Sequence, residues 1–274
     1  MPVPVQAKSF SVFQKDVYSF FKSNGRHTLP WRKTKNPYRI LVSEIMLQQT
    51  QVDRVIPKYR SFLKRFKTPQ VLAEASLGEV LREWQGLGYN RRAKMLHEAA
   101  KAIMLNYEGK IPKSYADLTS LPGIGDYTAK AIRVFAWNEP EVLIETNVRS
   151  VFLHHFFPNQ EGISDKKLLP YVEVTLDTKN TRGWYSALMD YGSYLKKTTL
   201  NPSRKSAHHT KQKSFKGSNR EVRGAILRAL ISEAKSLSVV FKELDFSQGR
   251  IEKQILALKK EGLVVIRKNK VQLP

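Results

Sequence analysis

The stretch LPGIGDYTAKAI, residues 121–132, is the part of this sequence that best predicts a fold. A proline and two glycines, Gly123 and Gly125, indicate a turn, and a helical pattern follows at once. Residues 115–120 can supply a helix before the turn, which gives a helix–hairpin–helix unit. Glycines let the backbone approach a ligand closely, and the free N–H groups at a helix start favour an anion. We therefore expect Gly123 and Gly125 to bind a phosphate of DNA.

The charge of the chain supports this expectation. The 274 residues include 47 Lys and Arg against 24 Asp and Glu, a formal net charge of +23, which indicates nucleic acid first and an anionic membrane surface second. No apolar run is long enough to span a bilayer, and MPVPVQAKSF lacks an apolar signal core, so we expect a cytoplasmic protein, nucleoid-associated in a prokaryote. The absence of cysteine excludes disulfides, thiolate catalysis and cysteine-ligated metal clusters.

Helical patterns follow one another from Phe10 to about Asn201, including one long amphipathic run from Ser43 to Tyr59. Residues 201–218 are predicted to be a basic connector, which either lies along an anionic partner or is a solvated linker. Residues 219–274 then give helices and two short alternating segments around Lys268-Asn269-Lys270. This order predicts a small winged-helix-like unit, whose hairpin either contacts DNA or only caps the unit.

Five motifs, taken in order, resemble the HhH-GPD superfamily of base-excision DNA glycosylases. They are LPWR (29–32), SEIMLQQTQV (43–52), GLGYNRRAKMLH (86–97), LPGIGDYTAKAI (121–132) and ETNVRSVF (145–152). The first three are similar to the adenine glycosylase branch, MutY. The resemblance covers about residues 10–200 and implies an all-α, two-lobed fold, here with a small C-terminal winged-helix-like (α+β) unit. It implies one lobe of residues 1–30 and 140–200, carrying Glu145, and a helical bundle of residues 31–139, carrying the hairpin.

Two glutamates are the predicted catalytic acids. Glu44 lies in an otherwise apolar helix, where burial favours its neutral form; taken alone, it is interpreted as a buried glutamate paired with an arginine. The resemblance implies that Glu44 protonates the leaving base, that Glu145 stabilises the oxocarbenium-like sugar, and that Asn147 fixes that carboxylate and the water. The superfamily usually has Asp at position 145, and a shift of ~1 Å can cost about 100-fold. Glu145 alone equally fits a helix N-terminus that Thr146 caps.

Tyr127 decides the predicted reaction type. In bifunctional relatives this position is a lysine, whose amine forms a Schiff base with the sugar. A phenol cannot form that imine. The resemblance therefore implies a monofunctional glycosylase that leaves an abasic site and has no strong lyase activity.

The remaining predicted residues contact DNA. A base must leave the stack to be cut, and the resemblance places Gln48 and Tyr89 in the vacated helix, where a flat ring replaces the base by stacking. Tyr89 taken alone also fits ordinary packing under a tight turn. Arg32 is predicted to hydrogen-bond the extruded base, cap a helix or bind phosphate. Further contacts are assigned to Gln49, Arg91, Arg92, Lys205, His209 and Lys211.

Two features of MutY proteins are missing. Those proteins usually carry four cysteines after a segment like ALMDYG (187–192), and they end in a nudix-like domain that recognises 8-oxoguanine. We therefore expect no cluster, other metal or cofactor, because His208 and His209 alone are no ligand set. Three hypotheses remain: a glycosylase for mispaired adenine, one for uracil, thymine or another damaged base, and a non-catalytic lesion-binding protein. The expected partner is double-stranded DNA with a mispaired or damaged base, bound by a monomer.

Overall fold

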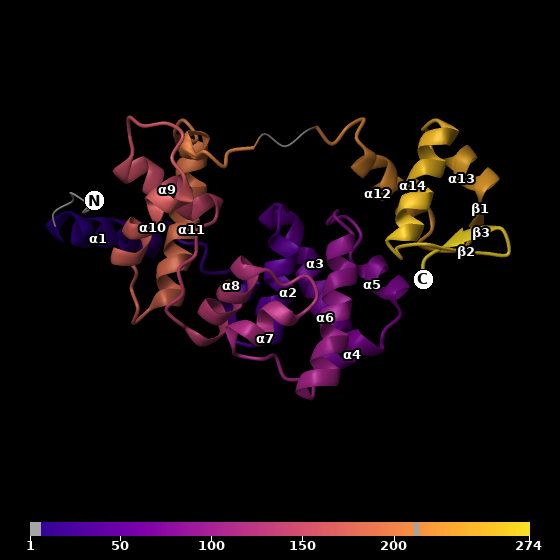
Figure 1. Ribbon diagram of the computed structural model, residues 1–274, viewed down its shortest axis with the longest axis horizontal. Helices are drawn as coiled ribbons and strands as arrows, with labels where there is room; N and C mark the ends of the chain where they lie inside the picture. The colour runs from indigo at the N-terminus through magenta and orange to yellow at the C-terminus, as the bar shows by residue number, and fades with distance from the viewer. Residues whose placement is uncertain (1–6, 211–213) are drawn as a thin grey trace. The chain divides into compact units, whose positions relative to one another are not determined.

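The structure is a computed structural model that describes residues 7–210 and 214–274, with side chains described from Phe10 onward. Helices make up most of the fold, and the strands form one small sheet near the C-terminus (Figure 1). The prediction of an all-α fold with a small C-terminal α+β unit is confirmed.

Internal contacts divide the chain into two compact units. Unit 1 holds Met1–Ile40 and Gly125–Lys211, and unit 2 holds Leu41–Ile124 and Gln212–Pro274. These bounds differ from the predicted lobes, because the segment after the hairpin and the start of the predicted connector belong to unit 1. The C-terminal residues belong to unit 2 instead of forming a separate body.

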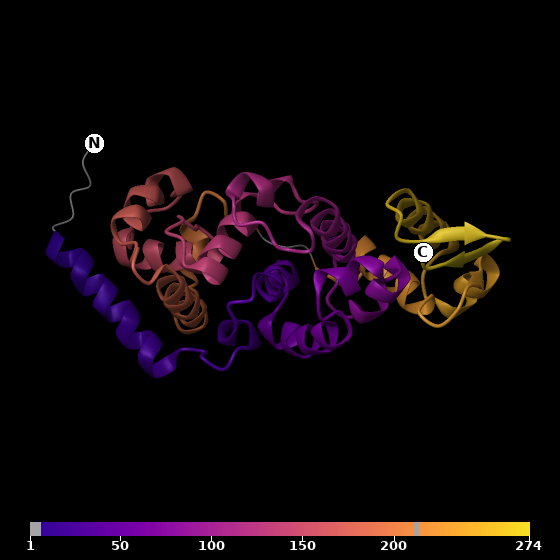
Figure 2. The ribbon, with the colours of Figure 1, turned by 90° about the horizontal axis from the view of Figure 1, so that it is seen from below.

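The elements of unit 1 are mainly long helices. They are α1 (Ala7–Asn24), the 3-10 helix η1 (Pro30–Lys33), α8 (Asp126–Trp137), α9 (Thr146–Phe156), α10 (Asp165–Val174), α11 (Thr181–Thr198) and the 3-10 helix η2 (Pro202–Lys205). Helix α11 is central, since it packs against α1, α8, α9 and η2 (Figures 1 and 2).

Close packing on α11 sets the position of α9. A Cβ atom added to Gly192 would lie 2.1 Å from the Asn147 carbonyl oxygen, so only glycine lets the first turn of α9 lie this near to α11. Tyr185, fully buried on α11, accepts the Leu143 N–H at 2.9 Å and donates to the Glu141 carbonyl at 3.1 Å. These contacts fix the chain that leads into α9.

Unit 2 begins within α2 (Pro37–Leu47), which spans the division between the units. The helices that follow in its first segment are α3 (Val52–Arg65), α4 (Pro69–Glu74), α5 (Leu77–Glu83), α6 (Arg91–Tyr107) and α7 (Tyr115–Ser120). Thr68 caps α4 by accepting the Val71 N–H, and Ser76 with Glu79 forms a capping box on α5. The predicted single run over residues 43–59 is wrong, because the chain turns at residues 48–51 between α2 and α3.

The C-terminal residues have the element order of a winged helix. They form α12 (Asn219–Ala229), β1 (Lys235–Ser236), α13 (Leu237–Glu243), α14 (Gln248–Lys260), β2 (Val265–Arg267) and β3 (Lys270–Gln272). The antiparallel sheet has the order β1-β3-β2. Lys268 and Asn269 join β2 to β3 with φ of 47° and 59°, as a two-residue type I′ hairpin turn requires.

Hydrogen bonds to main-chain carbonyls join this winged-helix unit to the helices of unit 2. The Gly78 N–H donates to Pro274 at 3.0 Å, Arg82 Nε donates to Ile231 at 2.8 Å, and Lys94 Nζ donates to Glu261 at 2.7 Å. The donors lie on α5 and α6. The winged-helix unit is therefore docked, which explains its place in unit 2.

Candidate nucleic-acid interface and active site

The hairpin between α7 and α8 uses its two glycines differently. Gly123 has a φ of +76°, and a Cβ atom there would lie 2.5 Å from Met95 Cβ on α6, so the fold itself requires this glycine. Gly125 is the N-cap of α8 with a φ of −93°, and a Cβ atom there would meet nothing within 4 Å. The protein thus leaves open space at Gly125, as the predicted phosphate contact requires.

Glu145 is the N-cap of α9, and its carboxylate is held by the helix that it begins. Oε1 accepts the N–H groups of Asn147 at 2.8 Å and Val148 at 3.0 Å, and Oε2 accepts Asn147 Nδ2 at 3.2 Å. Thr146, predicted as the cap, is the first helical residue instead. The extra methylene of Glu relative to Asp therefore does not leave the carboxylate loose, and Asn147 does fix it.

The other predicted catalytic residues are half-buried. Glu44 lies on α2 between the buried Ser43 and Ile45, and Tyr127 is the second residue of α8. Glu44 belongs to unit 2, whereas Tyr127 and Glu145 belong to unit 1. The joint action of the two carboxylates on one sugar stays a prediction.

Arg92 is a structural residue, not the predicted DNA contact. Its Nη1 donates to the carbonyls of Ile45, Met46 and Gln48, at 2.8, 3.0 and 2.6 Å, where α2 ends. Its Nη2 donates to Thr50 Oγ1 at 2.9 Å and to the carbonyls of residues 87 and 88 at 3.2 Å. Burial lowers the pKa of Arg92 to about 10. One guanidinium thus joins the end of α2 to the GLGY turn.

Both turns held by Arg92 contain a residue in the left-handed region. Gln49 has a φ of 52° and is exposed, and Tyr89 has a φ of 47° and is 38% exposed. Such values are strained for a residue with a side chain. Gln48, the other residue predicted to enter the vacated helix, lies in the turn that follows α2. The strained turn displays Gln49 at the surface.

The ring of Tyr89 lies near two guanidinium groups. Arg92 Cζ is 5.5 Å from the ring centroid, and Arg220 Cζ, from α12, is 5.7 Å from it. Arg220 Nη1 also donates to the Tyr89 hydroxyl at 2.8 Å. Arg220 was not predicted from the sequence, because 131 residues separate it from Tyr89. The winged-helix unit therefore contacts the predicted intercalating residue.

Arg32 does not face an open base pocket. Its guanidinium donates to both oxygens of Asp190, at 2.7 and 2.8 Å, and to the Ser186 carbonyl at 3.2 Å. The Asp190 side chain is 2% exposed and also accepts Arg26. Burial alone would raise the pKa of Asp190, but the hydrogen bonds and charge of Arg32, with those of Arg26, hold it below its usual range. Arg32 was predicted to bind the extruded base, cap a helix or bind phosphate, but it forms this ion pair instead. The pair is needed because a buried carboxylate without a partner is costly.

The predicted basic connector is partly folded. Pro202, Ser203 and Ser206 are buried, and Ile163 pairs with Lys205 and Ala207 through main-chain hydrogen bonds of 2.9 and 3.0 Å. These contacts pack residues 202–207 onto unit 1.

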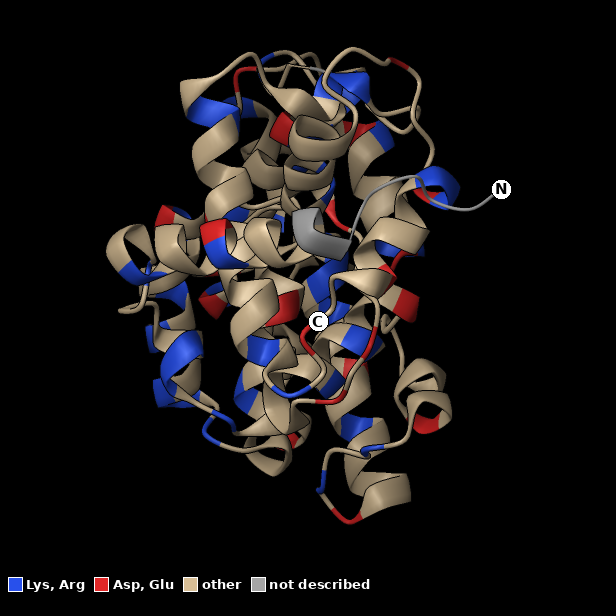
Figure 3. Cartoon of the chain, turned by 90° about the vertical axis from the view of Figure 1, so that its left-hand side faces the viewer, with Lys and Arg blue, Asp and Glu red and all other residues tan. Residues whose placement is uncertain are grey.

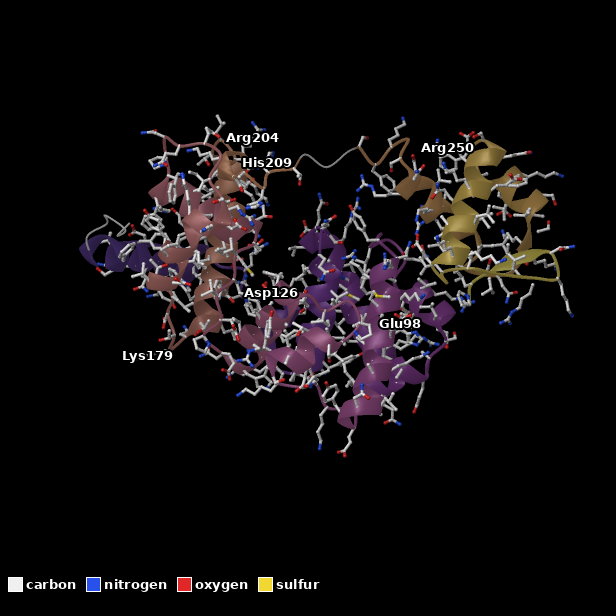
Figure 4. The ribbon with its side chains drawn as sticks, in the orientation of Figure 1. Glu98, Asp126, Lys179, Arg204, His209 and Arg250 are labelled. Atoms are coloured by element: carbon white, nitrogen blue, oxygen red, sulfur yellow. The ribbon has the colours of Figure 1, made fainter. Side chains whose placement is uncertain are left out.

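Three connector residues were predicted to bind DNA. Lys205 Nζ donates to the Pro158 carbonyl, and His209 is exposed in the segment that follows η2 (Figure 4). Lys211 lies outside the described residues.

Lys196, near the end of α11, is a residue that sequence reasoning missed. Burial lowers its pKa, and the negative charge of Glu145 opposes that shift. Lys196 therefore lies in the electrostatic field of the predicted catalytic carboxylate. Its sequence context, YLKK, gave no such signal.

Basic residues recur along the helices and loops of the chain (Figure 3). Within the described ranges, no group of three or more His, Asp or Glu is placed to hold a metal ion. Across the same ranges, no helix has the length and apolar character needed to cross a membrane.

The hairpin with its flanking helices and the capped start of α9 define a helix–hairpin–helix protein. A model of the HhH-GPD superfamily of base excision DNA repair proteins matches residues 42–176. A thymine/uracil-DNA glycosylase of Pyrobaculum aerophilum is 33% identical over 168 residues, which are 61% of this chain and 71% of that protein. The chain belongs to the HhH-GPD superfamily of base excision DNA repair proteins.

Two other similarities are informative. An adenine DNA glycosylase of Buchnera aphidicola subsp. Baizongia pistaciae is 38% identical over 185 residues, 67% of this chain and 53% of that protein. The chain thus spans about half the length of that relative. The solved structure of a thermostable thymine-DNA glycosylase superposes with a TM-score of 0.60 at 25% identity, over 68% of this chain and 87% of that one.

Arg91 and Arg92 are neighbours that allow a matched comparison. Arg91 is exposed, whereas Arg92 is hydrogen-bonded to the turn after α2 and to the GLGY turn. We expect Arg92→Lys to lower the free energy of unfolding by about 2 kcal/mol, since a lysine cannot reach both turns. Arg91→Ala should leave stability within about 0.5 kcal/mol and weaken binding to duplex DNA. Thermal unfolding and fluorescence anisotropy measure the two effects. Equal stability of the two variants would contradict the role of Arg92.

The hairpin glycines give a second pair. Gly123→Ala should destabilise by about 2 kcal/mol or more, because Cβ meets Met95 and φ is positive. Gly125→Ala should change stability by less than about 1 kcal/mol, and it should weaken duplex binding about tenfold by blocking a phosphate. Denaturant unfolding and DNA titration test both. Unchanged DNA affinity of the Gly125→Ala variant would show that this turn does not contact a phosphate.

Arg220→Ala should impair the entry of Tyr89 into a duplex, because Tyr89 loses the planar guanidinium group that lies near its ring and donates to its hydroxyl. Fluorescence of 2-aminopurine beside a mispair rises when bases unstack; we expect that rise to shrink toward the level of Tyr89→Ala. Arg220→Lys keeps the charge but not the planar group, so it should restore affinity without restoring the signal. A full signal from Arg220→Ala would show that Tyr89 works without this contact.

Proposed function

We propose that this protein is a monofunctional DNA glycosylase that binds double-stranded DNA and removes a mispaired adenine. The observation that carries the proposal is the Glu145 carboxylate, anchored by two N–H groups of α9 and by Asn147. The similarity to adenine DNA glycosylases supports adenine as the base. The net charge of +23 supports a polyanionic partner.

The proposed reaction is hydrolysis of the N-glycosidic bond of a base flipped out of the duplex. Glu44 donates a proton to the leaving base, which weakens the bond to the sugar. Positive charge then develops on the sugar, and the fixed carboxylate of Glu145 stabilises it electrostatically. Water then adds to the sugar cation and gives its proton to the Glu44 carboxylate, which regenerates the acid and leaves an abasic site. This proposal assigns Tyr127 no covalent role, because a phenol cannot form an imine.

A second candidate substrate is thymine or uracil in a mismatch. The thymine/uracil-DNA glycosylase of Pyrobaculum aerophilum and the thermostable thymine-DNA glycosylase favour it. The four cysteines usual in MutY proteins are missing. The corresponding segment contains Ser203 and Ser206, whose side chains carry hydroxyl groups and not thiolates. A cysteine-ligated cluster therefore does not fit this chain, and the proposed reaction involves none.

A panel of duplexes tests the proposal and its alternatives. The mispairs contain adenine, thymine, uracil, 8-oxoguanine or hypoxanthine, each assayed with and without alkali. We expect strand breaks only after alkali and fastest with adenine. Breaks before alkali would contradict the monofunctional assignment, and preference for thymine or uracil would select the second candidate.

The two carboxylates are tested on the best duplex. Glu44→Gln and Glu145→Asn should each lower the single-turnover rate by at least about 100-fold while duplex affinity stays near that of the unmodified protein. Asn remains a good N-cap, so Glu145→Asn removes the charge with little loss of helix stability. If either variant keeps near-normal excision, that residue has no catalytic role. Tight binding without excision by the unmodified protein would favour a lesion-binding protein.

A further inference from the structure

A pocket of about 270 Å³ lies within unit 1, where the start of α9 and the end of α11 meet residues 201–210. Every residue that lines the pocket is polar, and none is acidic. Its cationic and imidazole groups come from Arg149, Lys196, His208 and His209. Serine, threonine and asparagine side chains complete the lining.

The ammonium group of Lys196 has no acidic partner in direct contact among the described residues, although the charge of Glu145 acts on it. Arg149 is neutralised by Asp165, which accepts its guanidinium at 2.7 and 2.8 Å. Lys196 is half-buried, and among the described residues it makes no hydrogen bond or close ion pair. A partly desolvated ammonium without an acceptor costs free energy, which a bound anion would offset. The other charges that act on Lys196 are those of Glu145, Arg26 and Lys197.

The donors favour a phosphate over other anions. Lysine binds phosphate as a point charge, while hydroxyl and imidazole groups supply directed hydrogen bonds. Thr146, the first residue of α9, lines the pocket directly after Glu145 in the chain. A phosphate bound here therefore lies beside the predicted catalytic carboxylate.

We propose that this pocket binds a phosphate of the DNA backbone next to the nucleotide that is processed, with Lys196 as the main cation. The inference rests on the proposed function, because it needs DNA at Glu145. Residues 201–210, which stand where MutY proteins usually have cysteines, then supply the polar wall of a phosphate site. His208 and His209 contribute donors to it and no metal.

Single methylphosphonates in the duplex test the contact, because each removes the charge of one phosphate. The full chain is used with Lys196→Met, which keeps the aliphatic stem, and with Lys197→Met, its exposed neighbour on α11. In the unmodified protein, one methylphosphonate near the target base should weaken binding about tenfold. Lys196→Met should bind the normal duplex about tenfold more weakly and be insensitive to that substitution. Lys197→Met should keep the sensitivity.

Three outcomes would overturn the inference. In the first, Lys196→Met binds the duplex and excises the base normally. In the second, Lys196→Met binds weakly, but every methylphosphonate still lowers its duplex affinity as much as in the unmodified protein. In the third, excision slows while duplex affinity is unchanged, which makes Lys196 a positioning residue for Glu145. Lys196→Arg keeps the charge and should keep the sensitivity, and thermal unfolding of each variant checks that it folds.

A second arm uses inorganic phosphate without DNA. Saturable binding of inorganic phosphate that depends on Lys196, combined with no methylphosphonate effect, would assign the pocket to a free phosphate and overturn the backbone contact. Excision by the unmodified protein is measured on the same duplexes. Absence of excision refutes the proposed function, whereas excision without methylphosphonate coupling refutes only the phosphate site.

Discussion

The guanidinium group of Arg92 holds together the surface that carries Gln49 and Tyr89. It donates to carbonyls at the end of α2 and in the GLGY turn, so the two turns share one cation. Both turns contain a non-glycine residue at positive φ, a conformation that costs free energy unless the surroundings fix it. Arginine suits this task because its planar fork presents several donors at once. The strain is thereby compensated within the protein, before any DNA is bound.

The start of α9 depends on the same principle of fixed geometry. Gly192 permits α9 to lie on α11, and Tyr185 holds the chain before it. Glu145 then caps its own helix with a carboxylate that Asn147 also fixes. The unusual glutamate is thus accommodated locally, because its longer side chain turns back to the N–H groups of the first helical turn.

The winged-helix unit is part of unit 2 and not a tethered module. Main-chain carbonyls of this unit accept hydrogen bonds from α5 and α6, and Arg220 reaches Tyr89. This docking brings Arg220 of α12 to the ring and hydroxyl group of Tyr89 in the GLGY turn.

The sequence alone determined the elements whose signals are local. Glycine and proline marked the hairpin, and the order of helices and short alternating segments in residues 219–274 predicted the winged-helix unit. The family motifs added the two glutamates and Tyr127. Tertiary structure alone decided which arginines serve the fold, because the partners of Arg32 lie more than 150 residues away and those of Arg92 are mostly main-chain carbonyls. Tertiary structure also placed Lys196 at a polar pocket. The Lys196 ammonium group becomes partly buried and feels the charge of Glu145 only because α9 packs against α11.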